Sequence, residues 1–324
     1  MKLSLNALLK IARVKRYWRP SQLARVAWGI FRNFRRQLQI LCLLNKEAFA
    51  PIISDDLRFP FRYLTENYLS RGLTTTERAC SFLYHYSRLA SLFSPHLLRQ
   101  TMHGDFTILE KWELGSHYRI AVCLSRPFAE GELTLNLEIN GTVVFVLSFT
   151  IVPGQVVGVV DRDVLMVSRV QGMRGCQQEI YEATKAFNEV APSALLIAAL
   201  QGVAKALQIV KLAGVCATDQ AYYQEIHASS FKQAYDEFWL ELGASKNANN
   251  FFVCSIPPPE KPMLLIRNGH KGRTKKKRKF KQDIAEFVFQ SLRDECHVHS
   301  KLTIGATEKR QSLSERQTQN FAEP

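Results

Sequence analysis

Two segments rich in Lys and Arg are the parts of this sequence whose side chains are best suited to bind a ligand. Residues 1–46 contain 11 Lys or Arg and no Asp or Glu, and residues 267–281 contain nine and again no acid. Elsewhere in the chain acids outnumber bases, so the net charge of +14 comes from these two segments. Because clustered cations create a local positive potential, the sequence predicts an anionic partner at defined patches.

The N-terminal segment predicts contact with an anionic membrane surface, because aromatic residues stand beside its cations. Near such a surface each Lys or Arg contributes about 1 kcal/mol, and inserted apolar side chains add to the binding. The residues predicted to make this contact are Arg16, Trp18, Arg19, Arg32, Arg35 and Arg36.

The second segment has no Phe, Tyr or Trp before Phe280, and its central cations are Lys275, Lys276, Lys277, Arg278 and Lys279. These five could bind the phosphate of a lipid or of a nucleic acid, or remain a solvated charged face. Nucleic acid is the less favoured partner, because no helix-turn-helix and no aromatic platform motif accompanies the cations. A membrane surface is therefore the partner predicted here as well.

The cysteines and histidines predict no metal site. The seven cysteines lie far apart and form no C-x-x-C, which is typical of reduced thiols in a cytoplasmic protein. Only Cys296, His297 and His299 stand close enough to bind a metal adventitiously. No G-x-S-x-G occurs, so no Ser-His-Asp hydrolase site is identified.

Periodicity, capping patterns and turn residues predict the elements that would position these groups. Amphipathic helices are expected over residues 5–12 and 23–38, and Thr74 with Glu77 begins a capping-box helix that ends before Pro95. Strands are expected over residues 106–112, 118–124, 133–139, 143–152 and 164–170, with a hairpin turn at Asn140-Gly141. After them we expect helices over 179–187 and 192–207, a strand over 212–216, a helix over 222–242 ending at Gly243, a strand over 251–256 and a last helix around 284–292.

The predicted fold class is α+β. A basic helical region is expected over residues 1–100, an α+β domain with a mixed β-sheet and helices over 101–295, and a disordered polar tail over 296–324. The longest uncharged stretch, residues 139–160, is interrupted by Asn140-Gly141 and Pro153-Gly154, so paired strands are predicted there and not a spanning helix. The N-terminus does not follow the pattern of a secretory signal, and we expect a cytoplasmic protein that is peripheral on the inner membrane.

Several blocks of the sequence resemble the VirK/YbjX family of bacterial virulence- and envelope-associated proteins. They are His117-Tyr118-Arg119-Ile120, Glu130-Gly131-Glu132-Leu133, Val170-Gln171-Gly172 and, most specific of all, Ala234-Tyr235-Asp236-Glu237-Phe238-Trp239. The resemblance covers roughly residues 70–292. It implies a role in surface or outer-membrane functions and in tolerance of cationic antimicrobial peptides, and it brings no catalytic residues with it.

The order of elements from residue 106 onward is similar to the GNAT fold of acyltransferases that use acyl-coenzyme A. In that fold a turn after the fourth strand, together with the start of the next helix, holds the pyrophosphate of the cofactor through backbone N–H groups. The resemblance implies that Arg169, Gly172, Arg174 and Gly175 bind the cofactor here, although Arg174 stands where the pattern has Gly or Ala. The alternative is that Gly172 and Gly175 only form a strand-to-helix turn.

If the cofactor site is real, Tyr222 or Tyr223 could act as the general acid toward the departing thiolate. Glu237, or alternatively Asp219 or His227, could then serve as the base. Each of these side chains also has a structural interpretation, as a rim aromatic, a helix cap or a solvated helix face.

The function predicted from the sequence is that of a virulence-associated accessory factor at the cytoplasmic face of the envelope. It would influence the maturation of lipids or of outer-membrane and surface proteins, and it would bind a lipid or a protein client. One alternative is an acyl-coenzyme A-dependent acyltransferase, and a second is a nucleic-acid-binding protein.

Overall fold

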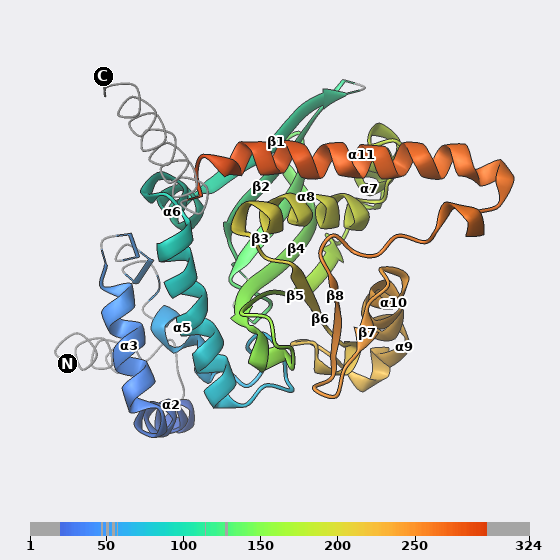
Figure 1. Ribbon diagram of the computed structural model, residues 1–324. Helices are drawn as coiled ribbons and strands as arrows, with labels where there is room; N and C mark the ends of the chain where they lie inside the picture. Colours follow the sequence, from blue (N-terminus) through green and yellow to red (C-terminus); the bar gives the residue numbers. More distant parts are fainter. Residues whose placement is uncertain are drawn as a thin grey trace, which may run out of the picture.

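The computed structural model describes residues 20–46, 48–49, 52–53, 56, 58–113, 115–126 and 129–296. A group of helices precedes an eight-stranded sheet, and further helices lie between and after its later strands (Figure 1). The predicted helix over residues 5–12 and the predicted tail from residue 297 onward fall outside the described residues.

The N-terminal helices are α2 (Pro20–Arg32), α3 (Phe34–Leu44), the short η1 (Phe59–Leu64), α5 (Thr75–Leu92) and α6 (Pro95–His103). The capping box is confirmed, since Glu77 N donates to Thr74 Oγ1 at 3.3 Å and Thr74 N donates to Glu77 Oε2 at 2.8 Å. Pro95 ends α5 as expected, but it also occupies the first position of α6, where a proline loses no hydrogen bond. The sequence interpretation missed this second helix.

The sheet begins as an antiparallel meander of β1 (Asp105–Glu113), β2 (Ser116–Leu124), β3 (Leu133–Ile139), β4 (Thr142–Pro153) and β5 (Asp163–Gly172). The Asn140-Gly141 turn is confirmed, with φ of 50° and 79° as its tight geometry requires. Strand β6 (Lys211–Val215) runs parallel to β5, and β8 (Phe251–Ser255) and the short β7 (Ser245–Lys246) complete the order β1-β2-β3-β4-β5-β6-β8-β7. The mixed sheet expected from the sequence is therefore present.

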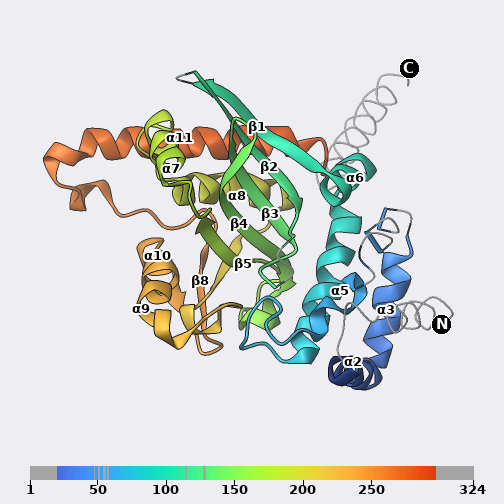
Figure 2. The same ribbon diagram turned by 180° about the vertical axis from the view of Figure 1, so that it is seen from behind.

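The crossover between the parallel strands consists of α7 (Gln177–Ala186) and α8 (Pro192–Leu207). The long helix α11 (Asn268–Arg293) lies along α8 in front of the sheet, and α5 flanks the sheet beside it (Figures 1 and 2). Gly202 permits this close approach, because a Cβ there would lie 2.5 Å from the Ala285 carbonyl oxygen. One buried apolar cluster includes Ile40 and Phe82 of the N-terminal helices as well as the sheet and α8, so these parts share a core.

The helix predicted over residues 222–242 is confirmed in part: helical turns run without a break from Glu225 to Glu241, but they begin three residues later than expected and include a π-helical segment. The chain there forms η4 (Glu225–His227), α9 (Ala228–Phe231), the π-helical η5 (Lys232–Glu237) and α10 (Phe238–Glu241), followed by Gly243 with φ of 82°. The last helix is much longer than expected, because the basic run lies inside α11.

Gly214 in β6 allows Trp239 of α10 to pack against the sheet. A Cβ at position 214 would lie 2.1 Å from the indole ring, and the indole N–H donates to the Val215 carbonyl oxygen at 3.2 Å. We therefore expect Gly214→Ala to lower the free energy of unfolding by about 1–3 kcal/mol, as overpacking does in other cores. Urea unfolding would measure this, with Gly269→Ala in α11 as a control, since no atom lies within 4 Å of its added Cβ. Equal effects of the two substitutions would contradict the explanation.

Among the described residues, no helix is both long and apolar enough to cross a membrane. The uncharged stretch of residues 139–160 contains β4, in agreement with the predicted strands.

Candidate functional site

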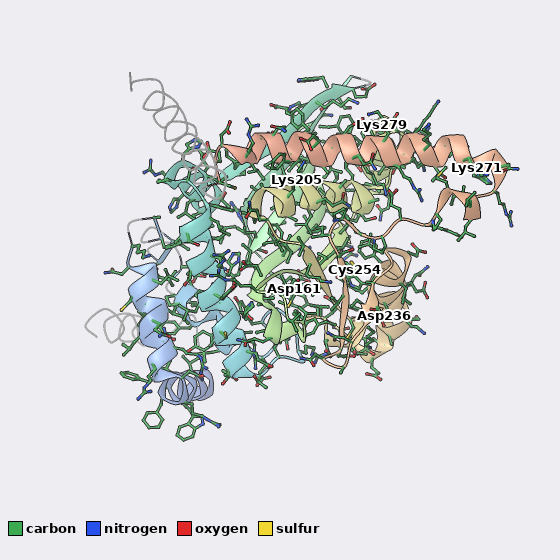
Figure 3. The ribbon with its side chains drawn as sticks, in the orientation of Figure 1. Asp161, Lys205, Asp236, Cys254, Lys271 and Lys279 are labelled. Carbon is green, nitrogen blue, oxygen red and sulfur yellow. The ribbon has the colours of Figure 1, made fainter. Side chains whose placement is uncertain are left out.

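A groove of about 1040 Å³ runs between α8 and α11 and is bounded by residues 256–261. We call it the α8–α11 groove. The two helices pack side by side, and Figure 3 labels Lys205 on α8 and Lys279 on α11. Much of the groove lining is apolar, and its apolar residues include Ala194, Ile197, Ala204, Ile209, Leu242, Ile256 and Pro257. Such a lining suits the hydrocarbon part of a ligand.

Cations stand along the rim of the groove in ion pairs, of which Lys205–Glu286 is exposed and Arg278–Glu260 is partly buried. Lys205 Nζ lies 2.6 Å from Glu286 Oε2, and Arg278 Nε lies 3.1 Å from Glu260 Oε2. Lys281 Nζ lies 3.8 Å from the same Glu260 carboxylate. Glu260 is the carboxylate that a phosphate at these cations would displace, and a phosphate can form more charge-assisted hydrogen bonds with them.

The N-terminus of α8 opens onto one end of the groove. Its first residues follow Ala191, which lines the groove and provides no side-chain cap for the helix. The first N–H groups of a helix have no partner within it and carry a partial positive charge. Lys277 Nζ donates to the carbonyl oxygen of Glu189 beside this end. A helix start and a nearby ammonium group together make a favourable place for a phosphate.

A second feature is the junction at which β5 and β6 separate. Their parallel pairing joins residues 165–167 to 212–214, whereas β5 continues beside β4 to Gly172. The register between β4 and β5 shifts at this point, and the buried Ser168 hydroxyl there has no hydrogen-bond partner among the described residues. Beyond Val167, therefore, β5 has no strand partner on the β6 side among the described residues.

Three ionisable side chains meet beside this junction. Arg169 Nε lies 3.2 Å from Glu130 Oε2, and both side chains are largely buried. Burial raises the pKa of Glu130, and the Arg169 charge opposes this shift. Burial also raises the pKa of Tyr235, the Glu130 charge adds to this shift, and the Arg169 charge opposes it. A carboxyl group whose pKa is raised, next to a tyrosine, is a candidate for proton transfer.

The residues predicted to bind a cofactor pyrophosphate are placed around the end of β5. Gly172 faces α7, where a Cβ would lie 2.8 Å from Ile180 Cδ1. Gly175 has φ of 86° in the turn, and Arg174 is exposed. Arg169 is paired with Glu130, so its charge is already balanced by a carboxylate.

The structure places the predicted acids and bases apart from the Glu130–Arg169 pair or on the surface. Tyr222 is 58% exposed, and Glu237 and His227 are also exposed. Tyr223 packs edge-on against Phe231 with ring centroids 5.4 Å apart. Asp219 accepts a hydrogen bond from Asn250 at 2.9 Å.

Sequence reasoning assigned no role to Glu130 or Tyr235, although both belong to blocks that carry the family resemblance. That signal could have directed attention to them.

The predicted anion contacts fall on two separate surfaces. On α11, Lys277 and Arg278 line the groove, while Lys275, Lys276 and Lys279 are exposed outside its lining. Arg32 and Arg35 are exposed at α2 and α3, and Arg36 is half-buried. Arg16, Trp18 and Arg19 lie outside the described residues. The basic part of α11 and α2 lie at opposite ends of the molecule in both views (Figures 1 and 2).

No group of three or more His, Cys, Asp or Glu side chains within the described ranges could hold a metal ion. Cys296 is a buried free thiol, whereas His297 and His299 are outside those ranges. The described part of the chain thus provides no candidate metal centre.

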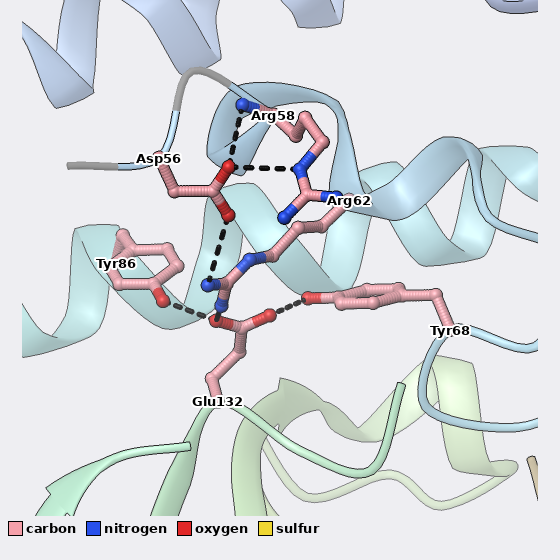
Figure 4. Close-up of polar contacts among 6 residues, drawn as sticks. All are labelled: Asp56, Arg58, Arg62, Tyr68, Tyr86 and Glu132. Carbon is pink, nitrogen blue, oxygen red and sulfur yellow. Dashed lines mark hydrogen bonds and ion pairs between the residues drawn. The ribbon is translucent and has the colours of Figure 1, made fainter. Parts of the chain in front are cut away.

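A buried carboxylate links the N-terminal helices to the sheet (Figure 4). Glu132, immediately before β3, accepts hydrogen bonds from Tyr68 at 2.5 Å and from Tyr86, and its Oε2 lies 3.4 Å from Arg62 Nη1. Burial raises the pKa of Glu132, and Arg62 and the two phenols oppose that shift. Arg62 also lies 3.9 Å from Asp56. Because the cluster is enclosed, we assign it to stability and not to the candidate site.

Comparison with known proteins identifies the family alone. No curated protein and no solved structure matches the chain. The model of one family, described as "Protein of unknown function (DUF535)", matches residues 13–288. This range contains both the α8–α11 groove lining and the strand junction. DUF535 is the family also known as VirK/YbjX, in agreement with the sequence blocks noted above. The chain belongs to the DUF535 (VirK/YbjX) family.

Proposed function

We propose that this protein is an acyl-coenzyme A-dependent acyltransferase that acts at the cytoplasmic face of the bacterial envelope. The observation that carries the proposal is the sheet: an antiparallel meander, one parallel pair that separates, a helical crossover and two further antiparallel strands. This order supports the resemblance to the GNAT fold. Fold alone does not determine chemistry, so the groove and the junction carry the rest of the argument.

The groove and the junction together suit the parts of an acyl-coenzyme A. Its phosphates would lie near Lys277, Arg278 and the N-terminus of α8, where cations and backbone N–H groups meet. Its pantetheine arm contains amides, which can pair with the free edge of β5. The bound thioester would supply an activated acyl group.

In the proposed transfer, an amine or hydroxyl of the acceptor attacks the thioester carbonyl carbon and the C–S bond breaks. The proton of the acceptor ends on the sulfur of coenzyme A, so the products are the acylated acceptor and the free thiol. Glu130 could take that proton, because its pKa is raised by burial. Tyr235, whose charge environment includes Glu130, would deliver a proton to the sulfur. Tyr222, Tyr223 and Glu237 would take these roles only if the thioester bound on their side of the molecule instead.

The family supports the setting proposed for this activity. A virulence-associated role in lipid or surface-protein maturation, and in tolerance of antimicrobial peptides, would follow if the acceptor is an envelope lipid or a client protein. A non-enzymatic accessory protein that binds lipid or client in the same groove is the competing proposal. The two differ in whether a thioester binds and is consumed.

The test is the thermal midpoint of the purified protein with coenzyme A, acetyl-coenzyme A and a long-chain acyl-coenzyme A. A ligand at ~100 times its dissociation constant should add about 2.7 kcal/mol of stability, seen as a raised midpoint. We expect Lys277→Glu/Arg278→Glu to abolish the shift, each variant being compared with its own ligand-free midpoint.

The matched control is Lys275→Glu/Lys276→Glu, which changes charge equally on the same helix outside the groove lining. This control should retain the shift. If Arg174→Glu abolishes the shift and the groove variant does not, the phosphates bind at the turn after β5 instead. If no thioester shifts the wild type, the acyltransferase proposal is wrong and the accessory protein becomes the better explanation.

A further inference from the structure

The cleft between α2 and the start of α5 has features that acyl transfer does not explain. It has a volume of about 770 Å³, and the residues that line it include Trp28, Arg32, Glu66, Thr75, Thr76 and Arg78. Figures 1 and 2 both place α2 beside the first turns of α5, on the side of α5 away from the later strands.

A buried positive charge, that of Arg78, borders this cleft. Arg78 is 8% exposed, and its Nε is buried without a hydrogen-bond partner among the described residues. Its other nitrogens donate to the Thr65 carbonyl oxygen and, at 3.4 Å, to Thr75 Oγ1. Burial lowers the pKa of this guanidinium, and the Glu66 carboxylate opposes the shift. A buried guanidinium N–H without an acceptor favours an oxygen-bearing ligand.

The N-terminus of α5 faces the same cleft. Thr74 caps this 18-residue helix, and the cap uses the Glu77 N–H and side chain. Thr75 and Thr76, at the first two helical positions, line the cleft, and N–H groups at such positions have no partner within the helix. The positive end of the helix dipole, Arg78 and the exposed Arg32 therefore all favour an anion in the same cleft, whereas the nearby acids Glu66 and Glu77 oppose it.

Exposed aromatic side chains adjoin the cleft. Trp28 is 60% exposed and Phe31 is 73% exposed, and their rings stack with centroids 5.8 Å apart. No acidic residue occurs in α2 or α3, whereas Arg32 and Arg35 are exposed there. Large aromatics beside cations on one amphipathic helix are typical of a surface that enters the interface of a lipid bilayer.

We propose that α2 docks on an anionic phospholipid bilayer, with Trp28 and Phe31 in the interface and a lipid phosphate in the cleft at the N-terminus of α5. The aromatic pair provides apolar insertion, and Arg32, Arg78 and the helix start provide the anion site. This docking surface lies on another side of the molecule from the α8–α11 groove, and it does not depend on acyl transfer.

Vesicle flotation tests the proposal, with phosphatidylcholine vesicles compared with vesicles that also contain phosphatidylglycerol. The full chain is expected to float only with the anionic vesicles. Trp28→Ala/Phe31→Ala should weaken this binding about tenfold or more. Trp112→Ala, which removes a 72% exposed tryptophan from β1, should leave it unchanged.

The phosphate position is tested by Thr76→Glu. A carboxylate at the start of a helix favours folding, so this variant should keep its thermal midpoint while vesicle binding falls about fivefold or more. Arg32→Gln should also weaken binding, whereas Arg99→Gln, at an exposed position of α6, should not. The proposal is overturned if the wild type does not bind anionic vesicles or if Thr76→Glu binds them as well as the wild type. It is also overturned if Trp112→Ala or Arg99→Gln weakens binding as much as the substitutions in α2.

Discussion

Replacing Glu132 with Leu is expected to lower the free energy of unfolding by about 3–5 kcal/mol. The substitution removes from the largely buried Arg62 the Glu132 carboxylate at 3.4 Å and leaves the hydroxyls of Tyr68 and Tyr86 without their acceptor. Asp56, at 3.9 Å from Arg62, can compensate only in part. Chemical unfolding monitored by tryptophan fluorescence would measure the loss.

A double-mutant cycle with Tyr68→Phe separates this network from a simple packing effect. Tyr68→Phe alone should lower the free energy of unfolding by about 1.5–3 kcal/mol, because its hydroxyl donates to a carboxylate. In the Glu132→Leu background the same substitution should have little effect, or even stabilise the protein. Additive losses would show that the hydrogen bond between the two residues is not what stabilises this region.

Features that depend on neighbouring residues could be predicted from the sequence. The Thr74 capping box, the Asn140-Gly141 hairpin and helix α8 agree with the expectation because each is determined within one or two turns of chain. The helix predicted over residues 222–242 is present from Glu225 to Glu241, but the apolar period could not reveal its π-helical turns over Lys232–Glu237, just before Trp239 packs on Gly214.

The candidate site could be predicted only in part, since its pieces are distant in sequence. The sequence identified Lys277 and Arg278 as anion contacts, but the groove needs α8, and the Lys205–Glu286 pair across it spans 81 residues. It also proposed that Arg169 binds a cofactor, and the resemblance blocks marked Glu130, but nothing local in the sequence could show that the two side chains pair. Charge along a chain reveals which side chains can bind an anion, whereas the fold decides which of them are already paired.

His85 is expected to make the protein sensitive to mild acid. Its ring is fully buried, and Nδ1 accepts a hydrogen bond from the Ile151 N–H at 3.0 Å, which requires the neutral ring with its proton on Nε2. That Nε2 is buried without a partner among the described residues. Burial lowers the pKa of His85 to about 3, whereas a histidine in the unfolded chain has a pKa of about 6.5.

Since the folded-state pKa is the lower one, the unfolded chain binds an extra proton at any pH between these two values. The stability that neutral His85 provides is therefore complete above pH ~6.5 and is lost as the pH falls, by about 1.4 kcal/mol for each pH unit. Urea unfolding of the wild type and of His85→Gln should show a stability difference that shifts by about 2–3 kcal/mol in favour of the variant between pH ~6.5 and ~4.5.

The carboxyl groups of Glu130, Glu132 and Glu138 act in the opposite sense, because their folded-state pKa values are raised by burial. Their contribution is present at low pH and is lost as the pH rises through those values, so it offsets part of the acid sensitivity of the wild type. Both proteins retain these three groups, and the difference between the two pH curves therefore isolates His85. Parallel curves would mean that His85 titrates alike in the folded and unfolded chains, and that the ring between α5 and β4 is not held neutral by its burial.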